Sequence, residues 1–473
     1  MTRSSANLEQ MLQLALQHHA AGRLSSAERL YRQTLQLRPN HAIALENCGL
    51  LAHQTGRHDA AVRFIRKAIA EGGGNAGSHY NLGLALQGLG RLDEAVASYT
   101  TALRLRPDLA EALYNRGTAL RLLDRFPAAA ADFGRAATLS PAFAEAHVNL
   151  ALALIALGRP EEAVAAYRSA LALRPQVAEL HNGLGTALSD LGRLDEAIRA
   201  YRQAIALKPD ALDAWFNLHS ALYGDDLEPA AQCLETALKI APDHVLSRFF
   251  LGVLRDHQGC LDAAQGHFSA LPEDSELPAW GLESWHYIKS INPRPRLIGE
   301  TSKGLSLGLA AARREGLVLE FGVRFGTTLN QIASHAGQPV HGFDTFHGLP
   351  EAWHEFPVGS YSTSGELPPV ASNAQLHPGL FSETIPPFLE AHAEPARFLN
   401  IDCDLYSSTK TVLDLMAPRI KPGTVIVFDE YLFTRHWREG EFKAFHEAVI
   451  AHGWRYEYLA AGLLTKQAVV IIR

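Results

Sequence analysis

The feature that most constrains this chain is a period of 34 residues that runs through its first half. The stretch "AGSHYNLGLALQGLGRLDEAVASYTTALRLRPDL" (76–109) recurs as "AEAHVNLALALIALGRPEEAVAAYRSALALRPQV" (144–177). Self-similarity at such a period is typical of repeat architectures, in which each unit buries its apolar face against its neighbours. We therefore expect the first half to be a stack of similar units without a single central core.

Each repeat unit carries the residue pattern of two packed helices. Small residues such as Gly83 and Ala95 recur where the helices should touch, and an aromatic residue such as Tyr99 fills the space beside them. A proline such as Pro107 closes the second helix, because proline lacks the N–H that another helical turn requires. Eight units are expected, beginning at Leu8, Ala42, Ala76, Ala110, Ala144, Ala178, Leu212 and Val245.

This pattern resembles the tetratricopeptide repeat family over residues 8–271. The resemblance implies an α-solenoid whose concave face binds other molecules, so we expect a protein or peptide partner.

Asparagine recurs at one position of successive units, with only Gly183 interrupting the series. An amide side chain both donates and accepts hydrogen bonds, so a row of them along the inner groove could hold the backbone of an extended peptide. The alternative is a solvated polar residue inherited by duplication of the unit. The candidate groove residues are Asn47, Asn81, Asn115, Asn149 and Asn217.

Composition narrows the classes of function. The net charge of −7 argues against a nucleic-acid-binding protein, since phosphate binding normally requires a basic surface. The four cysteines have no paired spacing, so neither a disulfide framework nor a zinc site is expected. No apolar run approaches the length of a signal-peptide core or a membrane span, so we expect no membrane span and a cytoplasmic location.

The repeat pattern ends at residue 271, and the proline-rich segment 272–297 is expected to be a linker with a short helix over 281–290. From residue 298 to 473 helical segments alternate with apolar runs such as "LVLEFGV" and "TVIVFDEY". Such alternation predicts a second domain of the α/β, Rossmann-like class, with a mainly parallel sheet and ligands at the carboxyl ends of its strands.

Acidic residues follow two of these predicted strands. Asp402 comes directly after "FLNI", and Asp429 with Glu430 comes after "VIVF". Because the carboxyl ends of parallel strands meet at one edge of the sheet, these carboxylates should lie close together. The alternative is that they cap helices or pair with Lys410 or Arg419.

The first strand of the second domain leads into a glycine turn. In "LVLEFGVRFGTTLNQIA", Glu320 ends the strand and the turn carries Gly322 and Gly326. Glycines at these positions let a ligand approach the backbone. An acidic first residue suits a ligand with cationic groups, such as S-adenosylmethionine, better than a ligand with a pyrophosphate. Asp344 ends the next strand, where a carboxylate commonly accepts hydrogen bonds from ribose hydroxyls.

Five ordered segments, "EFGVRFGTT", "GFDTFHGLPEAW", "GLFSETIPPFL", "NIDCDLYSSTKTVLDLM" and "KPGTVIVFDEY", resemble the macrocin O-methyltransferase family over residues 298–473. The resemblance implies a class I methyltransferase that uses S-adenosylmethionine and Mg²⁺ and acts on sugar hydroxyls. It implies that Asp402, Asp429 and Glu430 bind the metal, which activates the acceptor oxygen, and that Asp402 is the candidate catalytic base. The cofactor-binding positions it implies are Glu320, Gly322, Gly326 and Asp344.

The sequence departs from the family pattern at Glu430, where an aspartate is usual. Glutamate extends the carboxylate by one methylene, and Mg²⁺ tolerates displaced ligands poorly, so Glu430 is the weakest of the three ligand assignments. Asp404 could be a ligand or a residue behind the ligands.

The leading function is an O-methyltransferase that acts on a hydroxyl-bearing small molecule or glycan and whose repeats recruit the acceptor or a partner. Two alternatives stay open: a repeat-based scaffold with a catalytically weak domain, and a methyltransferase of protein substrates.

Overall fold

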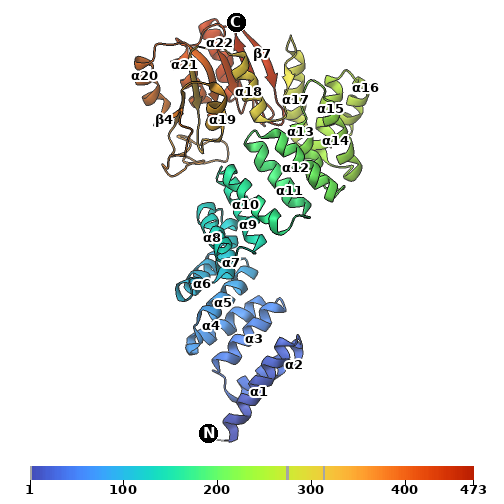
Figure 1. Ribbon diagram of the computed structural model, residues 1–473, viewed down its shortest axis with the longest axis vertical. Coiled ribbons are helices and arrows are strands. Elements are labelled where there is room, and N and C mark those ends of the chain that lie inside the picture. Colours follow the sequence, from blue (N-terminus) through green and yellow to red (C-terminus); the bar gives the residue numbers. More distant parts are fainter. Residues whose placement is uncertain (1–2, 273–275, 313–314) are drawn as a thin grey trace. The chain divides into compact units, whose positions relative to one another are not determined.

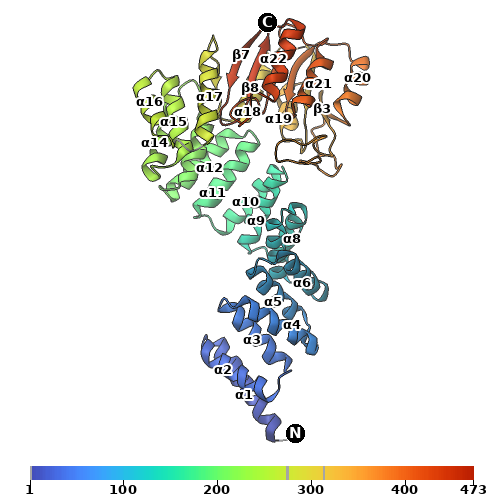
Figure 2. The same ribbon diagram turned by 180° about the vertical axis from the view of Figure 1, so that it is seen from behind.

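A computed structural model describes residues 3–272, 276–312 and 315–473 (Figures 1 and 2). The chain divides into two compact units, and each is described by itself. Unit 1 comprises Met1–Leu157 with Ala172–Arg174, and unit 2 comprises Gly158–Leu171 with Pro175–Arg473. The sequence instead proposed a division at residues 271 and 298, and those domain boundaries stay a prediction.

Sixteen α-helices form the repeats, and their pairing follows the 34-residue period. From the second unit on, the first helix of each pair begins at the residue where the period predicts a new unit. The first helices are α1 Arg3–Ala20, α3 Ala42–Gln54, α5 Ala76–Gly88, α7 Ala110–Leu122, α9 Ala144–Ala156, α11 Ala178–Asp190, α13 Leu212–Ala221 and α15 Val245–His257. The second helices are α2 Leu24–Leu37, α4 His58–Ala68, α6 Leu92–Leu105, α8 Phe126–Leu139, α10 Pro160–Leu173, α12 Leu194–Leu207, α14 Glu228–Ile240 and α16 Leu261–Ser269, and a π-helical turn η1 covers Ile69–Gly73.

The paired helices touch where the sequence places its small residues. A Cβ atom on Gly83 would lie 2.5 Å from the Tyr99 ring, and one on Gly185 would lie 2.5 Å from the Tyr201 ring. Both rings are buried. The prediction that an aromatic side chain fills the space beside a small residue is therefore confirmed at these pairs.

A hydrogen bond that recurs between adjacent 34-residue repeats was not predicted from the sequence. The third residue after a unit start donates a side-chain N–H to the carbonyl of the proline six residues earlier: His181 Nε2 to Pro175 O at 2.9 Å, and Trp215 Nε1 to Pro209 O at 2.9 Å. This carbonyl lies just beyond the end of a helix, where backbone acceptors lack intrahelical partners. Histidine and tryptophan share a ring N–H but are otherwise dissimilar side chains, so a comparison of the repeat sequences does not show that they form the same hydrogen bond.

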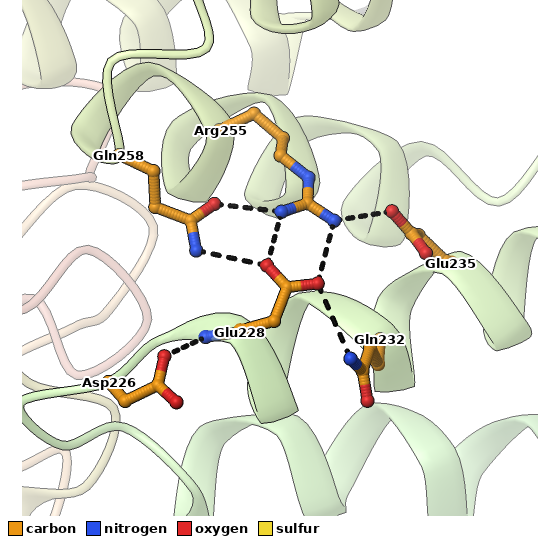
Figure 3. A network of polar contacts seen from close by, with 6 residues as sticks. All are labelled: Asp226, Glu228, Gln232, Glu235, Arg255 and Gln258. Atoms are coloured by element: carbon orange, nitrogen blue, oxygen red, sulfur yellow. Dashed lines mark hydrogen bonds and ion pairs between the residues drawn. The ribbon is translucent and has the colours of Figure 1, made fainter.

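Charged side chains tie α14 to α15 (Figure 3). Arg255 contacts Glu228 Oε2 through Nη1 at 2.6 Å and Glu235 Oε1 through Nη2 at 2.5 Å, and Gln258 donates to the same Glu228 carboxylate. A guanidinium presents its donors as a rigid fork, so one arginine can hold two carboxylates of a neighbouring helix. The contact fixes the relative position of these two helices.

Unit 2 also contains an eight-stranded sheet in the order β1-β7-β8-β6-β5-β2-β3-β4. Five of its strand pairs are parallel, and β8 runs antiparallel to β6 and β7, so the predicted mainly parallel sheet is confirmed. The strands are β1 Arg296–Leu297, β2 Leu317–Phe321, β3 Val340–Asp344, β4 Ala374–Pro378, β5 Ala396–Ile401, β6 Val425–Phe428, β7 Tyr456–Ala461 and β8 Ala468–Ile472.

Two strands, β1 and β4, were not expected, and β1 lies in the segment 272–297 that was expected to be a linker. The β4 segment, "AQLHP", lacks β-branched residues, and its positions are partly buried or exposed. It pairs with β3 alone at the sheet edge. Its alignment depends on β3 rather than on its own propensity.

Helices cover both faces of the sheet. Val318, Phe398 and Val425 point to the face covered by α18 and α19, whereas Leu319 and Leu399 point to the face covered by α20, α21 and α22. This alternation follows from the two-residue period of a strand. The helices are α18 Thr301–Ala311, α19 Thr327–Ala336, α20 Phe381–Ala391, α21 Tyr406–Met416 and α22 Glu441–His452.

The last repeats share a hydrophobic core with the sheet. Phe249 and Phe250 of α15 belong to the same buried cluster as the strand residues Leu319 and Ile401. Helix α17 (Glu276–Ser290), which lies in the segment expected to be a linker, adds Trp285 to this cluster, with its side chain fully buried. The apolar face of the final repeat is thus covered within unit 2.

Across residues 3–272, 276–312 and 315–473, no helix is both long enough and apolar enough to cross a bilayer.

His219 gives the shared core a sensitivity to acid. Burial, and secondarily the nearby His244, lower the pKa of this fully buried histidine from 6.5 to about 4, although the hydrogen bond from its Nδ1–H to the Phe216 carbonyl opposes the shift. Between pH 6.5 and about 4 the unfolded chain binds a proton at this position that the folded chain does not. Stability is therefore lost as the pH falls through this window, by about 3 kcal/mol.

We predict that His219→Phe, which fits among the rings of Phe216 and Phe250, makes the melting temperature less dependent on pH between 6.5 and 4. The exposed His286 provides the control, since His286→Phe makes the same substitution outside the buried core. Equal pH dependence of His219→Phe and the wild-type protein would contradict the assignment.

Candidate functional site

A cavity of about 460 Å³ opens at the carboxyl ends of the central strands. It lies where β2 has β3 on one side and β5 on the other, so the order of strands reverses there. Open α/β sheets bind ligands at such a switch point. Of the seven residues that the sequence assigned to cofactor or metal, five line the cavity: Gly322, Asp344, Asp402, Asp429 and Glu430.

The ends of β2 and β5 meet closely at Gly322. This residue has φ of +88°, and a Cβ atom on it would lie 1.7 Å from the carbonyl oxygen of Asp402. Glycine is therefore required both by its backbone conformation and by the space available. The contact places the loop after β2 beside the first acidic residue after β5.

Asp344 organises the loop after β2. Its Oδ2 atom accepts hydrogen bonds from the backbone N–H groups of Val323 and Arg324, both at 2.8 Å, and its Oδ1 atom accepts from the N–H of Phe346 at 2.7 Å. A carboxylate has about four acceptor positions, so one is left for a ligand in the cavity. The assignment of Asp344 to ribose hydroxyls stays a prediction.

Two predicted cofactor residues do not line the cavity. Glu320 is fully buried and accepts a hydrogen bond from Asn400 Nδ2 at 2.9 Å. Burial raises the pKa of Glu320 to about 8 despite the hydrogen bonds from Thr328 and Asn400, and Asp344 and Asp429 raise it further. Gly326 precedes the first turn of α19 and has φ of +76°. Direct contact of Glu320 and Gly326 with a cofactor stays a prediction.

The cavity concentrates negative charge. Asp402 lines it, and its pKa is raised well above the usual range, first by burial and then by the carboxylates of Asp429 and Asp404. Burial and the nearby Glu430 and Asp429 raise the pKa of Asp404 to about 7. Like charges in a poorly solvated place resist ionisation, so the cluster favours a bound proton or a cationic ligand.

A buried glutamate that the sequence analysis does not single out holds the two acidic loops in place. Glu441 is fully buried, and its two carboxylate oxygens accept from the backbone N–H of Cys403 at 3.4 Å and of Glu430 at 3.1 Å. It links the loop after β5 to the loop after β6. Its position at the start of a helix, 11 residues after Glu430, gives the sequence no signal of this role.

Positive and polar groups already contact the carboxylates after β6. Lys466 Nζ lies 2.6 Å from Glu430 Oε1, and Gln467 Nε2 donates to Asp429 Oδ1 at 2.9 Å. In the part of the chain that the structure describes, no three histidine, cysteine or acidic side chains are arranged as a metal site. Carboxylates suit Mg²⁺ chemically, but these residues do not present a ready set of three ligands.

The cavity fits S-adenosylmethionine better than it fits a Mg²⁺ ion. Its volume is within the range of ligand pockets, and the backbone at Gly322 leaves no room for a side chain between β2 and β5. Its acidic lining complements a sulfonium and an ammonium group. The residues present therefore fit this cofactor.

The asparagines of the repeats are partly engaged. In unit 1, Asn115 Nδ2 donates to Tyr80 Oη at 3.0 Å and Asn149 Nδ2 donates to Tyr114 Oη at 3.3 Å. In unit 2, Asn217 Nδ2 donates to Asn182 Oδ1 at 3.1 Å. These bonds join successive repeats. Asn149 Nδ2 also donates to the Glu145 carbonyl at 3.0 Å, so both of its N–H groups are used, whereas its oxygen has no partner among the described residues.

Comparisons with known families match the repeats and the domain with the sheet to two different families. Residues 12–76, 80–142 and 143–210 match tetratricopeptide repeat models, and residues 319–431 match a methyltransferase domain model. The chain thus carries tetratricopeptide repeats and a methyltransferase domain. The methyltransferase match extends from β2 through the acidic loop after β6, which includes every predicted cofactor and metal residue.

Solved structures similar to the chain include repeat proteins. A tetratricopeptide protein, YrrB, described as having an unusual peptide-binding site, is 27% identical, with 39% of this chain and 95% of that chain covered and a TM-score of 0.36. A MamA protein is 24% identical, with 36% and 92% covered and a TM-score of 0.35. The C-terminal part of a repeat protein from Cytophaga hutchinsonii is 12% identical, with 50% and 97% covered and a TM-score of 0.45. No curated protein matched.

We predict that Gly322→Ala destabilises the protein far more than Gly337→Ala. Both glycines have positive φ, but a Cβ atom on Gly337 meets nothing within 4 Å. Gly337→Ala should therefore cost about 1 kcal/mol of backbone strain, whereas Gly322→Ala should cost at least about 3 kcal/mol because the strands must separate. Chemical denaturation measures both, and equal costs would show that β2 and β5 are not in close contact there.

Proposed function

We propose that the protein is an O-methyltransferase that uses S-adenosylmethionine, has a Rossmann-like class I domain, and acts on a hydroxyl of a sugar or glycan-like acceptor. The observation that carries the proposal is the position of Asp402, a carboxylate with a raised pKa in a cavity of a methyltransferase domain. A cytoplasmic location stays a prediction.

The chemistry needs a base and a fixed geometry. S-adenosylmethionine supplies a methyl group on a positively charged sulfur. An alcohol is a weak nucleophile, so Asp402 accepts the hydroxyl proton as the new oxygen–carbon bond forms and the carbon–sulfur bond breaks. Asp344 and Glu441 hold the surrounding loops through backbone N–H groups, which fixes the distance between base and acceptor.

Metal assistance by Asp402, Asp429 and Glu430 is a further proposal from the family resemblance. These residues would bind the cation through their oxygens, and Glu430 would have to release Lys466 to do so.

We predict that Asp402→Asn lowers turnover by about 10²- to 10⁴-fold, because an amide cannot accept the proton. Affinity for S-adenosylhomocysteine should change little. The measurement is S-adenosylhomocysteine formation on a panel of glycans and peptides, with Mg²⁺ and with excess chelator. Asp414→Asn is the control, since Asp414 is a surface residue of α21 that pairs with Lys410.

Each arm of this experiment decides one point. Full wild-type turnover in chelator would contradict metal assistance and leave Asp402 as the base. Turnover on peptides alone would favour the protein-methylating alternative. Binding of S-adenosylhomocysteine without turnover on any acceptor would favour a scaffold with a weak domain.

We also propose that the asparagines of the repeats hold the backbone of an extended peptide. Asn115 and Asn149 each donate one N–H to a tyrosine of the preceding repeat, and Asn149 donates its other N–H to the Glu145 carbonyl. Their orientation is therefore fixed, and within the described residues each amide oxygen is left to accept from a peptide N–H.

We predict that replacing Asn81, Asn115 and Asn149 with alanine removes partners captured by the intact protein in quantitative pull-downs. The matched control is the double variant Tyr80→Phe, Tyr114→Phe, which removes the same hydrogen bonds between repeats but keeps the amides. Loss of the same partners in the control would show that the asparagines only support the fold.

A further inference from the structure

Arg324 is a cation in the cavity wall that no part of the proposed reaction uses. It belongs to the loop after β2 and lines the cavity together with Gly322 and Asp402. Its guanidinium carbon lies 4.4 Å from the centre of the Phe325 ring and 4.9 Å from the centre of the Tyr361 ring. Two aromatic faces at these distances stabilise a cation and restrict its motion.

The backbone of Arg324 is fixed as well. Its φ is +47°, which is uncommon for a residue with a side chain, and its N–H donates to Asp344 Oδ2 at 2.8 Å. The side chain therefore starts from a defined point at the cavity and is directed along the rings.

The N–H donors of the Arg324 guanidinium are available to a ligand. Within residues 3–272, 276–312 and 315–473 it forms no hydrogen bond and no ion pair at contact distance, although Arg255 and Arg438 are paired with carboxylates. The aspartates of the cavity act on Arg324 only through space. An arginine held by ring stacking, with its planar fork unpaired, is arranged to bind a carboxylate through two parallel hydrogen bonds.

The negative charge of the cavity lining restricts the class of ligand that can bind beside Arg324. Five carboxylates line the same cavity, so a ligand that carries only negative charge would be repelled. An α-amino acid group satisfies both sides, because its carboxylate can face Arg324 while its ammonium faces the aspartates. A lone phosphate or an acidic sugar supplies no such cation.

We infer that Arg324, stacked between Phe325 and Tyr361, binds the carboxylate of an α-amino acid group in the cavity, and that this group is the methionyl end of the cofactor. The inference rests on the proposed function for the identity of the cofactor. It makes Arg324 a determinant of cofactor specificity.

The test is calorimetric binding of two ligands to the full-length protein: S-adenosylhomocysteine and its analogue without the carboxylate. Wild-type protein should prefer S-adenosylhomocysteine by about 10- to 100-fold, the effect of a charge-assisted pair. Arg324→Met should bind both ligands alike, at the affinity that the wild-type protein has for the analogue. Arg324→Lys should keep part of the preference, since it keeps the charge but loses the planar fork.

Arg438→Met is the matched control, since Arg438 also stacks on an aromatic ring, 4.2 Å from the centre of Trp437, but does not line the cavity. It should keep the full preference.

Three results would overturn the inference. Arg324→Met could retain the wild-type preference, or it could weaken both ligands equally, which would mean that Arg324 only supports the loop. The third concerns an acceptor carboxylate. If Arg324→Met weakens only the binding of glucuronic acid relative to glucose, measured with saturating S-adenosylhomocysteine, the carboxylate belongs to the acceptor. Failure of the wild-type protein to bind S-adenosylhomocysteine would instead refute the proposed function.

Discussion

The need to cover the apolar end of the repeat stack governs the architecture of unit 2. A repeat buries its core only against its neighbours, so the last one exposes a hydrophobic face unless something else packs on it. Here Phe249 and Phe250 of α15 pack against Phe433, which follows the acidic loop after β6, with ring centres 5.3 and 5.6 Å apart. The Phe433 N–H also donates to Ser284 Oγ of α17 at 3.0 Å. The segment that closes the repeats therefore also supports the loop that carries Asp429.

Unit 2 contains a second contact between the repeats and the domain that carries the sheet. Ser189 and Ser220, from the ends of α11 and α13, both donate to the Glu300 carboxylate at 2.5 Å, next to the start of α18. Burial raises the pKa of Glu300, and the hydrogen bonds from the serines oppose the shift. Because this contact is polar and directional, it fixes the alignment of the repeats with the sheet, whereas the aromatic contact is apolar and non-directional.

How much could be read from the sequence depended on the range of each interaction. The helix starts at Ala42, Ala76 and Ala110 follow from a local period, and the meeting of Asp402 with Asp429 follows from the rule that parallel strands end together. The burial of Glu320 away from the cavity depends on which face of β2 it occupies, and the apolar run gave no alternation to decide this. Contacts such as Glu441 with the Cys403 N–H join loops whose spacing is set by packing, so no short pattern predicts them.

The shared core also limits how such a chain can change by duplication in evolution. A 34-residue unit gained or lost among α3–α8 leaves the residues that contact the sheet untouched, because each internal repeat meets only its neighbours. Loss of α15 would remove Phe249 and Phe250 from beneath the acidic loop and expose the Phe433 side chain. The contacts with the sheet therefore tie the carboxyl-terminal repeats to the methyltransferase domain, whereas they set no limit on the number of repeats at the amino-terminal end.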